Sequence, residues 1–256
     1  DFLRKNPDLL NKWLKGNGFR ENLKEKTPRI FTPGIAQESP HIGILNISDG
    51  CLDACSFCST RLVKGKHRSV SPEKILSEAK RYLENGCKEL WLTGQDTSCY
   101  GFDIGTNLAQ LAKKILEQNS GDYKIRLGMG NPRHLEKYLN EMLSVYEDDR
   151  IYKFIHLPVQ SGSDSVLQAM GRKHNVNTFR KMAEAFISKF SYFTLSTDII
   201  VGFPGETRED FEQTCKLISD LKPSICNITR FVARPNTVAD KLPNKIPGKE
   251  QHYRSA

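Results

Sequence analysis

Three cysteines, Cys51, Cys55 and Cys58, stand close together in the segment Cys-Leu-Asp-Ala-Cys-Ser-Phe-Cys. They come just after an apolar run at 42–47 of the kind that forms a buried strand. Cysteine thiolates normally hold a four-iron cluster in sets of four. A set of three leaves one iron without a protein ligand, much as a catalytic zinc keeps one position open for its reactant. Three clustered thiols are therefore one ligand short of a complete set, and a [4Fe-4S] cluster bound to them would keep one iron open to a small ligand.

Two other interpretations of the triplet remain open on the residues alone. In the first, the cysteines and His67 bind zinc, although His67 lies nine positions after Cys58, which is not typical of short zinc motifs. In the second, the cysteines are buried structural residues, which is unusual for three thiols within eight residues that have charged and small neighbours. Only the cluster accounts for both the number of thiols and their spacing.

Composition bounds the class of protein. The chain has seven cysteines, an odd number, which indicates a reducing compartment with a metal site rather than a disulfide framework. The sequence has neither a signal peptide nor an apolar run of about 18 residues, so we expect a cytoplasmic protein without a membrane segment. The net charge of +8 suits a polyanion such as RNA, and a solvated basic surface would explain it equally well.

An alternation of apolar runs and helical patterns begins near residue 41. The expected strands are 42–47, 89–93, 124–127, 153–158, 193–201 and 224–232. The expected helices between them are 72–85, 107–118, 132–146, 163–170 with 178–190, and 208–221. The alternation predicts parallel strands joined by crossover helices. Periodicity alone does not choose between an open doubly wound sheet and a barrel with six of the eight TIM units.

In both architectures, reactive residues lie in the loops at the carboxyl ends of the strands. The cysteine triplet follows the first strand, and Thr93-Gly94-Gln95-Asp96 follows the second. The loops after the other strands are polar or rich in glycine, and they span 128–131, 158–163, 201–206 and 233–237. We therefore expect a single site at this edge. Arg172 follows the fourth strand's loop, where a guanidinium is suited to hold a carboxylate through two parallel hydrogen bonds.

These motifs, taken together, resemble the radical S-adenosylmethionine (SAM) methylthiotransferase family. The resemblance rests on 50–60 with 64–69, on 156–163 with 170–172, on Gly-Phe-Pro-Gly-Glu-Thr at 202–207, and on Arg-Pro-Asn-Thr at 234–237, where the family has Arg-Pro-Gly-Thr. The segment 92–101 and the Cys-Leu-Asp-Ala-Cys start are most similar to the archaeal and eukaryotic members that act on N6-threonylcarbamoyladenosine in tRNA. The match covers about residues 41–240.

The resemblance implies a fold, cofactors and partners. The fold would be a partial (β/α)6 TIM-like barrel, with a [4Fe-4S] cluster on Cys51, Cys55 and Cys58 and SAM on the open iron. SAM cleavage by one electron from a donor such as ferredoxin or flavodoxin would start the activation of C2 of adenosine 37 in the tRNA anticodon loop. The sulfur would come from a second [4Fe-4S] cluster, expected only in the full-length protein. We expect a monomer and no catalytic acid or base.

The resemblance also carries site residues over to this chain. An aromatic residue precedes the third cysteine in the family, as Phe57 does here. In SAM enzymes of this kind, a Gly-Gly-Glu-like tripeptide contacts the SAM amino group, and here Gln95 and Asp96 replace its last two residues. The complete set of expected SAM contacts is Phe57, Thr93, Gly94, Gln95, Asp96, Gln160, Ser161, Arg172 and Asp198.

Both ends of the chain are polar and interrupted by proline and glycine, so we interpret them as linkers. On the family's plan, 1–40 is the remnant of a missing N-terminal cluster domain, 41–235 is the radical SAM core, and 236–256 leads towards a missing C-terminal TRAM domain. Such a piece would cleave SAM without thiolating tRNA. The alternatives are a methylthiotransferase acting on isopentenyladenosine in tRNA or on a ribosomal-protein aspartate, and a non-catalytic, metal-stabilised RNA-binding module.

Overall fold

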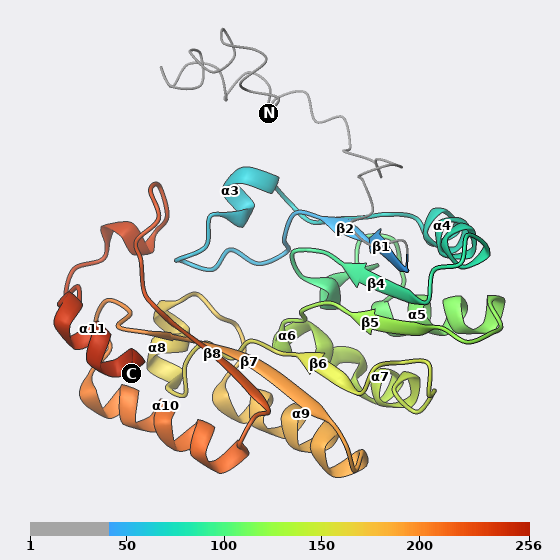
Figure 1. The fold of residues 1–256 in the computed structure, drawn as a ribbon. Coiled ribbons are helices and arrows are strands. Elements are labelled where there is room, and N and C mark those ends of the chain that lie inside the picture. The colour runs from blue at the N-terminus through green and yellow to red at the C-terminus, as the bar shows by residue number, and fades with distance from the viewer. Residues whose placement is uncertain (1–40) are drawn as a thin grey trace, which may run out of the picture. The chain divides into compact units, whose positions relative to one another are not determined.

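The computed structural model describes residues 41–256, so the predicted linker at 1–40 lies outside the described residues. Six parallel strands run through this part of the chain (Figure 1). They are β1 (Ile42–Asn46), β4 (Glu89–Thr93), β5 (Lys124–Leu127), β6 (Phe154–His156), β7 (Thr194–Val201) and β8 (Ile225–Arg230). Each lies within a run that the sequence predicts to be a strand.

The order of the strands decides between the two architectures. β1 pairs with β4 and β4 with β5, while β6 pairs with β7 and β7 with β8. Between these halves, the Ile125 amide donates to the Arg150 carbonyl at 2.7 Å, and the Gly130 amide donates to the His156 carbonyl at 3.0 Å. The strands therefore follow one another in chain order. A doubly wound sheet reverses its order at a switch point, so the partial (β/α)6 barrel is confirmed.

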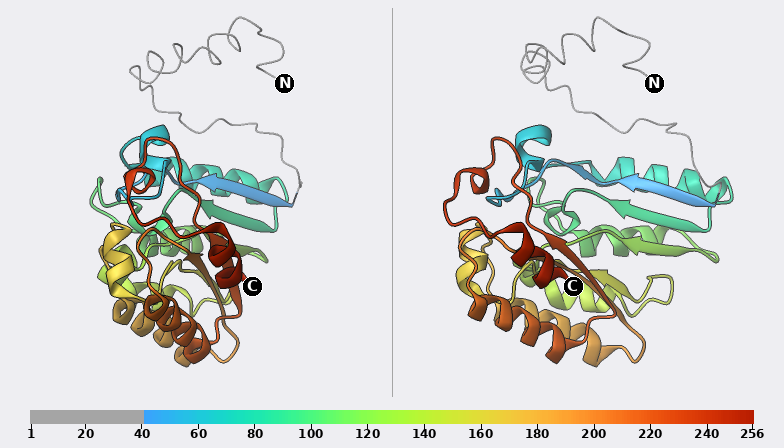
Figure 2. Two further views of the ribbon diagram at one scale, coloured as in Figure 1. Left: turned by 90° about the vertical axis from the view of Figure 1, so that its left-hand side faces the viewer. Right: turned by 60° about the vertical axis from the view of Figure 1, so that its left-hand side comes forward.

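Helices cover one face of this curved sheet (Figure 2). They are α4 (Pro72–Glu84), α5 (Leu108–Gln118), α6 (Pro132–Leu135), α7 (Leu139–Val145), α8 (Asp164–Ala169), α9 (Val176–Lys189) and α10 (Arg208–Leu221). Alternate strand residues are buried under the helices, as a two-residue period requires; examples are Leu90 and Leu92 of β4. Gly43 of β1 allows α4 to pack close to the sheet, because a β-carbon at this position would lie 2.6 Å from the Tyr82 ring of α4.

The predicted helix at 132–146 is divided. α6 and α7 flank a 3-10 turn, Glu136–Tyr138, and Tyr138 leaves the helical region with φ −140° and ψ 33°. A tertiary contact accounts for the break, since the buried Tyr138 hydroxyl donates to the Ser98 carbonyl at 2.6 Å. Short elements also escaped the sequence analysis: α3 (Thr60–Lys64), the pair β2 (Ser48–Asp49) and β3 (Arg68–Ser69), and the 3-10 turns Thr97–Cys99 and Ala239–Lys241. They are too short to show a period.

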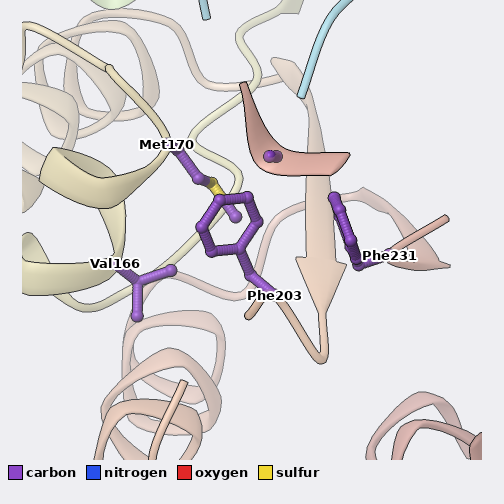
Figure 3. Packing of buried hydrophobic residues seen from close by; sticks show 5 residues of the cluster. Val166, Met170, Phe203 and Phe231 are labelled. Atoms are coloured by element: carbon purple, nitrogen blue, oxygen red, sulfur yellow. The ribbon is translucent and has the colours of Figure 1, made fainter. Parts of the chain in front are cut away.

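The tail at 236–256, expected to be a linker, packs on the barrel. Ala239 is fully buried with Val166, Met170, Phe203 and Phe231, and Figure 3 shows this group between α8 and the end of β7. The Phe203 and Phe231 rings meet edge to face at 5.1 Å. The apolar positions are too widely spaced to form a pattern in the sequence. Whether the tail also leads to a further domain stays a prediction.

Helix α11 (Gly248–Ser255) fastens the tail to the Gly-Phe-Pro-Gly-Glu-Thr loop. Gln251 Nε2 donates to the Gly202 carbonyl at 3.2 Å, and Arg254 Nη1 lies 2.7 Å from Glu206 Oε2. The two charged side chains are 6% and 1% exposed. Burial raises the pKa of Glu206, and the Gly202 amide and Arg254 offset that shift only in part. The pair is therefore a buried charge with a single cationic partner.

Arg254→Met is expected to lower the free energy of unfolding by about 3–5 kcal/mol, because it leaves Glu206 buried without its counter-charge. The double variant Glu206→Gln/Arg254→Met should recover much of this loss. Arg208→Ala is the control, since its pair with Glu212 is exposed and contributes little to stability. Urea unfolding measures all three. Equal losses for Arg254→Met and Arg208→Ala would contradict the assignment.

Candidate functional site

The cysteine loop is fastened at Ser56 to two distant parts of the chain. The Ser56 amide donates to the Met170 carbonyl at 2.8 Å, and its hydroxyl donates to the Ala169 carbonyl at 2.9 Å, both at the end of α8. The Ser56 carbonyl accepts from the Ala239 amide at 2.8 Å. The loop is thus held between the fourth crossover and the tail, with its thiols partly exposed.

A cavity of about 140 Å³ opens beside the triplet. Its walls come from the loops after β1, β4, β5 and β6, which agrees with the predicted site at the carboxyl ends of the strands. The lining residues are Cys51, Asp53, Cys55, Phe57, Cys58, Thr60, Gln95, Asp96, Met129, Gly130, Asn131, Pro158, Gln160 and Arg172. A larger cavity of about 490 Å³ lies between α5 and α7 on the helical face, remote from these loops.

Four side chains in the small cavity carry buried polar atoms that lack a hydrogen-bond partner among residues 41–256. They are Gln95 Oε1, Asp96 Oδ2, Gln160 Oε1 and Arg172 Nε. Buried polar atoms in proteins are nearly always paired, so this group is complementary to a polar ligand. Three acceptors and one guanidinium donor match the ammonium and carboxylate of an amino acid. The site therefore fits SAM bound beside the three thiols.

Gln160 holds an unfavourable backbone conformation at this place. Its φ is 76°, in the left-handed region that a non-glycine residue rarely adopts. Backbone hydrogen bonds to β7 enforce this conformation. The Gln160 amide donates to the Asp198 carbonyl at 2.8 Å, and the Gln160 carbonyl accepts from the Ile200 amide at 2.9 Å. Strain of this kind costs about 1–3 kcal/mol and is concentrated at functional sites.

Two of the three thiols, Cys51 and Cys55, are poor acids. Burial raises the pKa of Cys51 to about 11, and the nearby Asp96, Cys55 and Asp53 add to this effect. Burial also raises the pKa of Cys55, against the opposing charge of Arg172, whose Nη1 lies 3.7 Å from the sulfur. Binding of iron requires thiolates, so loading the site releases protons.

A buried polar network ties the cysteine loop to the loop after β5. Asp53, between the first two cysteines, accepts from Asn131 Nδ2 at 2.7 Å and from Arg133, and its Oδ2 lies 3.3 Å from Nε2 of the fully buried His134. Burial opposes ionisation of Asp53, but His134, Arg133 and Arg172 outweigh it and lower its pKa to about 2. His134 also lies 3.8 Å from Asp96. These contacts connect the cysteine loop, the loop after β4 and the loop after β5.

Some expected contacts lie away from the cavity. The Thr93 hydroxyl donates to the Leu45 carbonyl at 3.3 Å, and a β-carbon on Gly94 would lie 2.8 Å from Ser48 Oγ, so both residues serve strand-end packing. Ser161 is buried against Thr214 of α10, with their hydroxyls 3.3 Å apart. Asp198 pairs with His156 at 3.0 Å on the open face of the sheet.

The remaining expected contacts, Phe57, Gln95, Asp96, Gln160 and Arg172, do converge on the cavity. The sequence placed the loop 128–131 at this edge, but it assigned no individual contact to Gly130, Asn131 or Asp53, all of which line the cavity. Position was the available signal, because Asp53 stands inside the triplet and the other two follow β5 directly. The roles of individual residues towards SAM stay predictions.

The geometry does not support the zinc alternative. His67 is buried with Nδ1 3.3 Å from Cys99 Sγ and Nε2 3.1 Å from Ser69 Oγ, so its ring is engaged away from the triplet. Within residues 41–256, no three His, Cys, Asp or Glu side chains are close enough to hold a single metal ion. A cluster of several irons accepts thiols that are set farther apart than the ligands of one ion.

No helix among residues 41–256 is long and apolar enough to cross a membrane.

Comparison with known proteins decides the family. A family model described as the radical SAM superfamily matches residues 45–218. The chain belongs to the radical SAM superfamily. This membership explains why three cysteines, and not four, follow the first strand of the barrel.

Relatives extend the resemblance along the chain. A protein of Pyrococcus horikoshii, named probable threonylcarbamoyladenosine tRNA methylthiotransferase, is 47% identical over 225 residues, which cover 88% of this chain and 52% of the relative. A human protein named threonylcarbamoyladenosine tRNA methylthiotransferase is 39% identical over 227 residues, covering 89% of this chain and 39% of its own. This radical SAM chain is homologous to those enzymes. It spans about half the length of the archaeal relative or less in the human case.

Solved radical SAM structures share the fold. The methyltransferase TsrM from Kitasatospora setae superposes with a TM-score of 0.61 at 12% identity, covering 77% of this chain and 38% of TsrM. Coproporphyrinogen III oxidase from Escherichia coli gives a TM-score of 0.59 at 18% identity, covering 84% of this chain and 51% of the oxidase. At these identities the likeness concerns the barrel alone.

Asp53→Ala is expected to destabilise the cysteine loop, because it leaves Arg133 and the buried His134 without their carboxylate. The apo protein should lose about 3–5 kcal/mol of stability, and the reconstituted protein should lose iron faster to a chelator. The control is Asp122→Ala, an exposed carboxylate. Urea unfolding and the rate of iron release measure the two effects. Unchanged values for Asp53→Ala would show that the network does not hold the loop.

Proposed function

We propose that this chain is the radical-generating core of a tRNA methylthiotransferase that converts N6-threonylcarbamoyladenosine at position 37 to its 2-methylthio derivative. The observation that carries the proposal is the convergence of three thiols and four unpaired polar atoms on one cavity. The substrate follows from the names of relatives that are 39–47% identical over most of this chain.

Cys51, Cys55 and Cys58 would hold a [4Fe-4S] cluster, and SAM would occupy the cavity beside it. When bound, the two together supply the one-electron chemistry of the superfamily. The chain's own part is to bind and orient them. Gln95 and Asp96 offer unpaired oxygens to an ammonium group, and Arg172 offers its Nε–H to a carboxylate.

Arg172 is also held in place by contacts with the cavity wall. Its Nη2 donates to the Pro158 carbonyl at 2.9 Å, which fixes the guanidinium between the cavity wall and Cys55. A charge held in one position before the ligand arrives costs little ordering entropy on binding. Phe57 closes the wall beside the third cysteine, because its ring packs on the buried group around Met170 and Phe203. Water is thereby kept from that side of the cavity.

The partners of the whole protein belong to the same proposal. A second [4Fe-4S] cluster as sulfur source, a ferredoxin or flavodoxin as electron donor, and the tRNA anticodon loop as substrate are the partners we assign. An adenine acted on inside a folded loop must be splayed out of its stack, as is usual in recognition of single-stranded RNA. The chain's net charge of +8 suits contacts with phosphates.

Anaerobic reconstitution tests the cofactor site. The wild-type chain is expected to bind about four irons and to show a reduced-cluster EPR signal that changes when SAM is added. Cys55→Ala should abolish the signal, whereas the control Cys226→Ala, on the edge strand β8, should retain it. The chain should also cleave SAM to 5′-deoxyadenosine under reducing conditions. Zinc uptake without iron would refute the proposal.

Mass spectrometry of tRNA separates the possible substrates. The full-length protein should add a methylthio group to threonylcarbamoyl-modified tRNA and not to isopentenyl-modified tRNA. The chain alone should cleave SAM without forming this product. Modification of a ribosomal-protein aspartate, or binding of RNA without SAM cleavage, would replace the assigned function by one of its alternatives.

A further inference from the structure

The open face of the sheet carries a cation held between two aromatic rings. The Arg126 guanidinium on β5 lies 5.2 Å from the ring centroid of Trp91 on β4 and 4.8 Å from that of Phe154 on β6. The three residues come from adjacent strands and all face away from the helices. Trp91 is itself fixed, because its Nε1 donates to Glu89 at 2.8 Å. The rings attract the cation and restrict its movement.

This guanidinium has no hydrogen-bond acceptor and no acidic partner among residues 41–256, although Arg126 is half-buried. Other basic groups of the same face are engaged. His156 is paired with Asp198 at 3.0 Å, and Lys124 donates to the Asp149 carbonyl at 2.7 Å. Arg126 thus keeps donors free in a fork that matches the two oxygens of a carboxylate.

The group stands on β4, β5 and β6, the strands whose following loops line the cofactor cavity. Trp91 precedes Thr93, the last residue of β4, by two positions, and Arg126 precedes Gly128 by two. At a rise of about 3.3 Å per residue, the Cα atoms of Trp91 and Arg126 lie within about 7 Å of the ends of their strands, measured along the strands. A base whose reacting carbon lies at the strand ends, beside the cofactor, would place a long substituent near the Arg126 guanidinium.

We propose that Arg126, held by Trp91 and Phe154, binds the carboxylate of the threonylcarbamoyl group on the substrate adenine. The inference rests on the proposed function, since that substituent ends in a free carboxylate whereas an isopentenyl group is apolar. A bidentate contact between guanidinium and carboxylate gives both orientation and discrimination. Arg126 is then a specificity-determining residue, separate from the polar atoms that face SAM.

The test compares two synthetic anticodon stem–loops that differ only at the carboxylate, one with the free acid of the threonylcarbamoyl group and one with its methyl ester. The full-length protein, reconstituted with its cluster, is expected to bind the acid about 10- to 100-fold more tightly than the ester. Arg126→Gln should bind both equally. Arg126→Lys, which keeps the charge and loses the fork, should give an intermediate ratio. The control is Arg208→Gln, exposed on α10.

The acid-to-ester ratio is measured within one preparation, so a smaller folded fraction of a variant does not change it. An undiminished ratio in Arg126→Gln would overturn the inference. So would loss of SAM affinity in Arg126→Gln by the same factor, because the guanidinium would then serve the cofactor. If the wild type modifies threonylcarbamoyl-tRNA but does not prefer the acid, only this inference fails. If it modifies no such tRNA, the proposed function itself fails.

Discussion

The hydrogen bonds at Ser56 are the constraint on which the site depends. A loop of three ligating cysteines must present its thiols in one arrangement, yet it has no secondary structure of its own between β2 and α3. The end of α8 and the 3-10 turn at Ala239 bond both the amide and the carbonyl of Ser56. Asp53 adds a side-chain connection to the loop after β5. Elements far apart in the sequence therefore set the geometry of the cysteine loop.

Charge balance follows from the same arrangement. Arg172, close to Cys55, and the carboxylates Asp53 and Asp96 surround the thiols, and burial favours the protonated forms of Cys51 and Cys55. Asp53 is compensated by Arg133 and His134, so its charge is used for structure. Asp96 differs, because Ser98 and Asn131 donate to one of its oxygens, whereas the other has no hydrogen-bond partner among residues 41–256 and lies 3.8 Å from His134 Nε2. The hydrogen bonds of the two carboxylates thus differ. Those of Asp53 hold the loop, whereas Asp96 keeps one oxygen without a hydrogen-bond partner among residues 41–256.

The strands could be predicted from the sequence because their signals are local, whereas the choice of a barrel came from the family resemblance. Apolar runs marked all six strands, and the strand-end rule placed Gln95, Asp96, Gln160 and Arg172 together. Signals that depend on tertiary contacts were not readable. The break at Tyr138 is caused by a bond to Ser98, and the packing of the tail depends on Ala239 and on Arg254, residues without periodicity. Gln160 gave no hint of its positive φ, which β7 enforces.

The proposed function and the role inferred for Arg126 assign two kinds of recognition to different parts of the barrel. Loops at the strand ends carry the thiols and the unpaired atoms suited to SAM, and loops can exchange residues without disturbing the sheet. Trp91, Arg126 and Phe154 instead stand on strands, where each side chain has a fixed register with its neighbours. A contact that must discriminate between substituents on a base benefits from such rigidity, because a guanidinium that is already positioned loses little entropy on binding. On this proposal, substrate specificity would belong to the strands, and cofactor binding to the loops.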